Sequence, residues 1–129
     1  MKKIRNILVA FVAIEHLYFL VLEMFLWTSP IGLKTFNLTL EFANATATLA
    51  ANQGLYNGFL AGGLIWGLIS KENGASIKVF FLSCVVIAGI FGAATASFSI
   101  LYIQGLPAAL ALLLFFLPSS NIDDGNNKT

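Results

Sequence analysis

Charged residues are scarce in this sequence, and their scarcity excludes most soluble classes of protein. Only 10% of the 129 residues are Asp, Glu, Lys or Arg, against roughly 25% in soluble domains. The net charge is +1 and no basic face with interleaved aromatic residues is present, so we expect no nucleic-acid partner. With 58% hydrophobic residues and a mean hydropathy of +0.86, the composition indicates an integral membrane protein whose partner is the lipid bilayer.

Cysteine and histidine are each represented once. Cys84 is the only cysteine, which excludes an intrachain disulfide and a cysteine-rich metal site. His16 is the only histidine, and the Glu-x-x-His motif of carboxylate-bundle metal proteins is missing. We therefore predict no metal site, and the sequence identifies no cofactor.

Long apolar runs dominate what is present. Four segments approach the ~20 residues that span a bilayer, at residues 6–27, 47–69, 78–97 and 100–117. The first follows three basic residues and has no cleavage site, so we expect an uncleaved signal anchor. These segments predict an all-α, four-transmembrane-helix bundle over residues 1–117. Residues 118–129 are polar, and we expect a disordered tail there.

The connections between the segments differ in length. Residues 28–46 form the only long one, in which Pro30 is expected to stop the first helix. Residues 38–46 either form a short helix or extend the second span. Residues 70–76 form a polar turn, and the last connection must be tight.

The basic residues set the expected orientation. With four spans, six of them share the side that holds both termini, and Lys34 alone lies opposite. The positive-inside rule then places both termini in the cytoplasm. The six are Lys2, Lys3, Arg5, Lys71, Lys78 and Lys128.

Three ionisable residues interrupt the first apolar segment. Glu15 and His16 lie near its middle, and Glu23 lies toward the outer side. A spacing of seven residues places His16 and Glu23 on one helix face, and Glu15 points about a quarter turn away. Because ionisable groups at membrane depth are costly, they mark a candidate functional site.

Polar side chains on the later segments are expected at similar depths. The second carries Asn52, Gln53, Tyr56 and Asn57, and the fourth carries Gln104. If the outer ends of the first two spans are level, Asn57 lies opposite Glu15 and His16, whereas Gln104 lies higher, near the outer end. The polar residues then gather in the outer half, which predicts a pocket that opens outward rather than a through-channel.

Small residues recur every four positions on two segments. Gly54, Gly58 and Gly62 form one ridge, and Ala88, Gly92 and Ala96 form another. Ridges of this kind let helix backbones approach closely. They favour tight packing, either within the chain or between copies in a homo-oligomer.

The polar residues leave three functions open. The favoured one is a pocket that binds, or helps to move, a small polar or amphipathic ligand. The first alternative is a membrane enzyme that performs acid–base or redox chemistry on a lipid-soluble substrate. The second is a structural membrane subunit in which carboxyl, imidazole and amide groups hold the helices together.

Several motifs resemble a known family. They are EHLYF at residues 15–19, LEMFLWT with Pro30 at residues 22–30, LAANQGLYNGF at 49–59, AGIFGAAT at 88–95 and QGLPA at 104–108. The chain resembles the domain of unknown function 1304 family, small integral membrane proteins of bacteria. The resemblance implies a multi-pass protein of the bacterial inner membrane with four helices, and it implies no activity.

Overall fold

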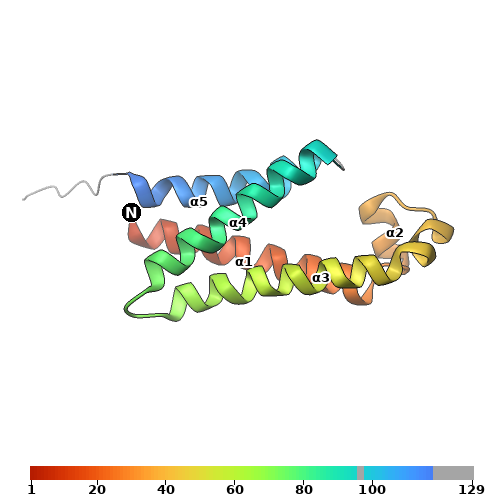
Figure 1. Ribbon diagram of the computed structural model, residues 1–129, viewed down its shortest axis with the longest axis horizontal. Helices are drawn as coiled ribbons and strands as arrows, with labels where there is room; N and C mark the ends of the chain where they lie inside the picture. Colours follow the sequence, from red (N-terminus) through yellow and green to blue (C-terminus); the bar gives the residue numbers. More distant parts are fainter. Residues whose placement is uncertain (96–97, 118–129) are drawn as a thin grey trace, which may run out of the picture.

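The computed structural model describes residues 1–95 and 98–117, in which every regular element is a helix. The elements are α1 (Lys2–Phe25), α2 (Pro30–Phe36), α3 (Leu40–Ile69), α4 (Gly74–Thr95), the π-helical turn η1 (Leu101–Gly105) and α5 (Leu106–Phe116) (Figure 1). The predicted all-α class is therefore confirmed. The predicted tail, residues 118–129, lies outside the described residues.

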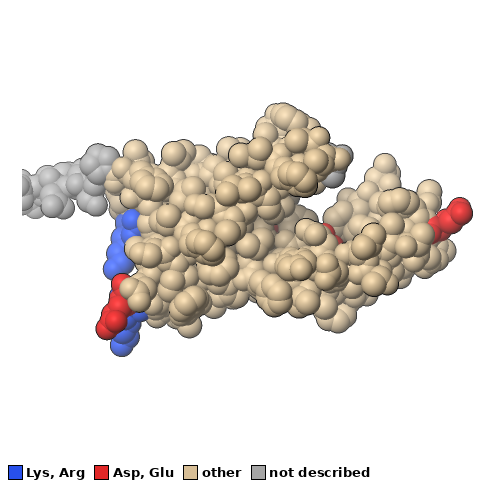
Figure 2. Space-filling model, viewed as in Figure 1, with Lys and Arg blue, Asp and Glu red and all other residues tan. Residues whose placement is uncertain are grey.

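The long helices pack side by side and run in alternating directions. α1 contacts α3 and α5, and α4 contacts α3, η1 and α5. The N-terminus, the α3–α4 turn and the end of α5 therefore lie at one end of the molecule, and α2 lies at the other (Figure 1). We call these the basic end and the α2 end, because the basic side chains visible in Figure 2 gather at the first.

Apolar side chains from all the long helices form one core. Its buried members come from α1, α3, α4 and α5, which explains why the helices associate. They are Val9, Val12, Ala13, Leu64, Leu82, Val85, Ala108 and Ala111. This core lies in the half of the molecule nearer the basic end, where the four helices overlap.

The helix boundaries differ from the predicted segments. α3 begins at Leu40 rather than at residue 47, so residues 40–46 extend the second segment instead of forming a separate helix. Thr39 caps α3 by accepting a hydrogen bond from the Phe42 backbone N–H at 3.2 Å. α4 begins at Gly74, so the polar turn before it is shorter than expected.

Pro30 begins a helix, and the prediction that it stops one was wrong. α1 already ends at Phe25, and Pro30 is the first residue of α2. Ser29 caps α2 by accepting a hydrogen bond from the Gly32 N–H at 3.3 Å. Proline suits this first position because its missing N–H would have no helical partner there.

The α2 end is built mainly from α1 and α3. α3 has 30 residues and is about 45 Å long. The last helical run is much shorter, since η1 has 5 residues and α5 has 11. α1 and α3 therefore extend past the other helices, and Figure 2 shows a notch between this extension and the far end of α4. An acidic side chain is visible at the floor of the notch.

By length and composition, two of the described helices can cross a membrane. They are α1 and α4. The run from Leu101 to Phe116 is apolar but shorter, and α3 is long but carries several amide and hydroxyl side chains. Two of the four predicted spans therefore correspond to helices that are long and apolar enough to cross a membrane.

Candidate functional site

His16 is completely buried, and both of its ring nitrogens are hydrogen-bonded. Nδ1 lies 2.8 Å from the Val12 carbonyl oxygen. Because a carbonyl oxygen only accepts, Nδ1 carries the proton and Nε2 is left as an acceptor. The Gln104 side-chain amide lies 3.2 Å from Nε2 and donates to it. The two contacts fix the ring in one orientation and one tautomer.

The π-helical turn η1 brings Gln104 to His16. Its last hydrogen bond runs from the Leu106 N–H back to the Leu101 carbonyl, five residues earlier. Pro107 follows and lacks an N–H, so the Ile103 carbonyl cannot receive the usual α-helical bond. Such π-turns are rare and occur frequently at functional sites.

Two glycines let η1 lie directly against α4. A Cβ atom built on Gly89 would be 2.8 Å from the Gly105 Cα, closer than real Cβ contacts allow. Both glycines are buried at this crossing. The close approach holds the turn that carries Gln104. Gln104 therefore lies level with the middle of α1, deeper than the predicted position near the outer end.

Glu23 pairs with Asn57 across the α1–α3 contact. The Asn57 side-chain amide donates to Glu23 Oε2 at 2.7 Å, and Asn57 is only 6% exposed. The expectation that Asn57 lies opposite Glu15 and His16 was wrong. α3 extends further toward the α2 end than predicted, so the outer ends of α1 and α3 are not level, and Asn57 is shifted toward Glu23.

Glu15 is partly buried and incompletely bonded. Its Oε2 atom is shielded from solvent and has no hydrogen-bond partner. Within residues 1–95 and 98–117, no basic side chain forms an ion pair with Glu15 or Glu23. Two carboxyl groups inside α1 are thus left without a cation from the described chain.

Three residues of the predicted pocket lie on the outside of α3. Asn52, Gln53 and Tyr56 are exposed, and the Tyr56 ring meets Phe59 edge-on at 5.9 Å. On α3, Gly54 and Gly58 instead face α1. The structure therefore brings His16 to Gln104 and Glu23 to Asn57, with Glu15 nearby in the same helix, and leaves the other three apart.

The small-residue ridges are used largely within the chain. A Cβ on Gly54 would be 2.7 Å from Met24 Cγ, and one on Gly58 would be 2.5 Å from Leu20 Cδ1. Gly92 packs against Ile100. On the first ridge Gly62 has open space beside it, and on the second Ala88 is exposed; Ala96 lies outside the described residues.

Sequence reasoning missed a cluster at the basic end. Lys78 is 6% exposed and donates to Asn6 Oδ1 at 3.0 Å. The Arg5 guanidinium lies 4.1 Å from the centre of the Phe115 ring, and the Lys78 ammonium lies 5.9 Å from it. Lys78 lies one turn inside α4, whereas the sequence places it at the first position of the third predicted apolar segment, where nothing distinguishes it from the surface lysines.

Two cavities lie away from the predicted pocket residues. A groove of about 590 Å³ runs between α4 and α5 near the basic end. A smaller one of about 240 Å³ lies between α4 and η1, lined by Val86, Ile90, Leu101, Tyr102, Gly105, Leu106 and Ala109. Neither is lined by a residue predicted from the sequence. In the described part of the chain, no three His, Cys, Asp or Glu side chains come together as metal ligands would.

Comparisons with known proteins agree with the motif resemblance. The family model described as "Protein of unknown function (DUF1304)" matches residues 10–116, which include every residue of the candidate site. An uncharacterized protein, YpaA of Lactococcus lactis subsp. lactis (strain IL1403), is 32% identical over 112 residues, covering 85% of this chain and 94% of that protein. No solved structure matches. The chain belongs to the DUF1304 family.

Proposed function

We propose that the chain is a four-span protein of the bacterial inner membrane. Large apolar side chains from every long helix are exposed, among them Phe11, Leu49, Ile87 and Leu113. A soluble monomer rarely exposes apolar area on that scale. Most of α1 and α4 is likewise unburied within the chain, which suits helices that face lipid.

The charge distribution supports cytoplasmic termini. Basic side chains of the described chain gather at the basic end, and the region between the two ends is nearly free of charge (Figure 2). Lys34, on α2, is the exception at the other end. The positive-inside rule then assigns the basic end to the cytoplasm and the notch to the outer side.

We further propose that the outer half binds, or helps to move, a small amphipathic cation. The observation that carries this proposal is that Glu15 and Glu23 lie inside α1 without a basic partner in the described chain. A carboxylate at membrane depth is expensive unless an opposite charge or water meets it. The notch, with an acidic side chain at its floor (Figure 2), gives a cation a route to that region.

Each polar residue then has a distinct role. Glu15 supplies the negative charge, and its Oε2 atom has no hydrogen-bond partner that a ligand would have to displace. Glu23 contributes the oxygen that Asn57 leaves free. His16 and Gln104 bond to each other and hold η1 against α1 beneath the site.

Binding of tetraphenylphosphonium, a lipophilic cation, to the purified protein tests this function by calorimetry. Glu15→Gln should weaken binding about tenfold or more, because a charge-assisted contact is replaced by a neutral one. Glu41→Gln is the matched control, since Glu41 is an exposed acidic residue at the start of α3. Equal affinities for the two variants, or no binding to the wild type, would contradict the proposal.

The second candidate function is a purely structural membrane subunit. It is favoured by the pairing of polar groups across helices, His16 with Gln104 and Glu23 with Asn57. On this alternative Glu23→Leu destabilises the protein because Asn57 loses its partner. Glu15→Gln and Glu41→Gln then leave tetraphenylphosphonium binding equally unchanged, whereas on the binding function only Glu15→Gln weakens it.

A further inference from the structure

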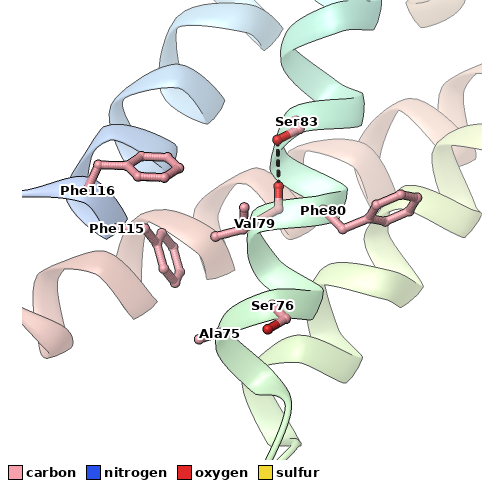
Figure 3. Close-up of a pocket in the computed structure, with 7 residues that line it drawn as sticks. All are labelled: Ala75, Ser76, Val79, Phe80, Ser83, Phe115 and Phe116. Atoms are coloured by element: carbon pink, nitrogen blue, oxygen red, sulfur yellow. Dashed lines mark hydrogen bonds between the residues drawn. The ribbon is translucent and has the colours of Figure 1, made fainter.

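We propose that the groove between α4 and α5 holds one anionic phospholipid of the cytoplasmic leaflet. The groove measures about 590 Å³ and is lined by Ala75, Ser76, Val79, Phe80, Ser83, Phe115 and Phe116. Figure 3 shows Phe115 and Phe116 on the α5 side, with Ala75, Val79 and Ser83 on the α4 side. The proposal rests on the membrane embedding proposed above, and it is independent of the outer notch.

The positive charge beside the groove is uncompensated. Arg5 and Lys78 both lie against the Phe115 ring, and that ring is also a wall of the groove. Lys78 has the neutral Asn6 oxygen as its partner, and the buried Arg5 Nε has none. No acidic residue of the described chain pairs with either, so the cluster lacks an anion that a phosphodiester would supply.

The groove itself suits an acyl chain. Its lining is mostly aliphatic and aromatic, and its hydroxyls are Ser76 and Ser83. Ser83 already donates to the Val79 carbonyl of its own helix at 2.8 Å, so it offers the groove little polarity (Figure 3). An apolar trough with a cationic cluster at its side matches a ligand with one anionic end and one hydrocarbon end.

The backbone at the start of α4 also favours an anionic ligand. α4 begins at Gly74, and Ala75 and Ser76 in its first turn line the groove. The first N–H groups of a helix lack helical partners and favour a negative charge. The headgroup therefore meets Arg5 and the start of α4, with the positive charge of the buried Lys78 nearby, and the acyl chain runs along the wall formed by Phe115 and Phe116.

Native mass spectrometry of the full chain, released from nanodiscs of equimolar phosphatidylcholine and phosphatidylglycerol, tests the proposal. We expect the wild type to retain phosphatidylglycerol preferentially. Arg5→Gln should reduce that preference about tenfold, and the matched control Lys3→Gln, an exposed basic residue of the same arm, should keep it. Equal retention of the two lipids, or equal effects of the two variants, would overturn the proposal.

A second variant tests the groove without changing any charged residue. Ser83→Phe fills the trough, and it should lower retention of phosphatidylglycerol while Arg5 and Lys78 stay in place. Unchanged retention would overturn the placement of the acyl chain. Inorganic phosphate added to detergent-purified protein should raise the unfolding temperature less than phosphatidylglycerol does; an equal rise would identify a phosphate site instead. Membrane fractionation of the same variants reports embedding separately.

Discussion

At the scale of single residues, the bond between His16 and Gln104 is the contact that joins α1 to η1 in the buried interior. His16 has no exposed surface, so replacing it leaves the half-buried Gln104 amide without its partner. Buried polar groups without partners cost free energy. The pair should therefore behave as a unit rather than as two independent side chains.

A double-mutant cycle measures that coupling. His16→Leu and Gln104→Leu should each destabilise the protein, and the double variant should lose less than the sum of the two. Interhelical hydrogen bonds in membranes give coupling free energies of about 0.6–2 kcal/mol. Unfolding titrations of the four proteins in micelles supply the number, and strictly additive losses would show that the bond contributes nothing.

The residues of the candidate site were predictable by type, and their partners were not. Ionisable residues inside an apolar segment single out Glu15, His16 and Glu23. Which amide each one meets depends on how far the helices slide past one another. α3 begins at Leu40, which is one of the two possibilities that the sequence left open for residues 38–46.

At the scale of the elements, the segments around α1 and α4 followed from their apolar runs. The π-turn did not, because a proline such as Pro107 disturbs the helix before it without specifying a π-turn. Neither did α2, because a proline after an apolar run signals a helix end and a helix start equally well. Gly54 and Gly58 set which face of α3 packs against α1. That packing leaves Asn52, Gln53 and Tyr56 exposed.

Alanine substitutions at two glycines distinguish the effect of close helix packing on stability from the effect of helix propensity. Gly89→Ala should destabilise the protein by about 1–3 kcal/mol, since its Cβ meets the Gly105 backbone at 2.8 Å. Gly62→Ala is the matched control, because nothing lies within 4 Å of a Cβ there. Micelle unfolding should show a loss only for the first. Equal stabilities would mean that α4 and η1 do not lie in direct contact.

At the scale of the whole molecule, the proposed orientation rests on the placement of charge at the two ends. Thiol labelling in intact cells tests that orientation in a Cys84→Ser background. A cysteine at Lys34, on α2, should react with a membrane-impermeant maleimide, whereas one at Lys71, in the α3–α4 turn, should react only after lysis. The opposite pattern would invert the topology and place the notch in the cytoplasm.

Protection of Glu15 from a carbodiimide tests the central claim, that an amphipathic cation binds at the Glu15 carboxyl group of α1. Dicyclohexylcarbodiimide reacts with carboxyl groups in apolar surroundings, and peptide mass spectrometry locates the adduct. We predict modification of Glu15 that falls when tetraphenylphosphonium is present, whereas the exposed Glu41 stays unmodified with or without the cation. A Glu15 that stays unmodified, or that reacts equally with and without the cation, would contradict the account.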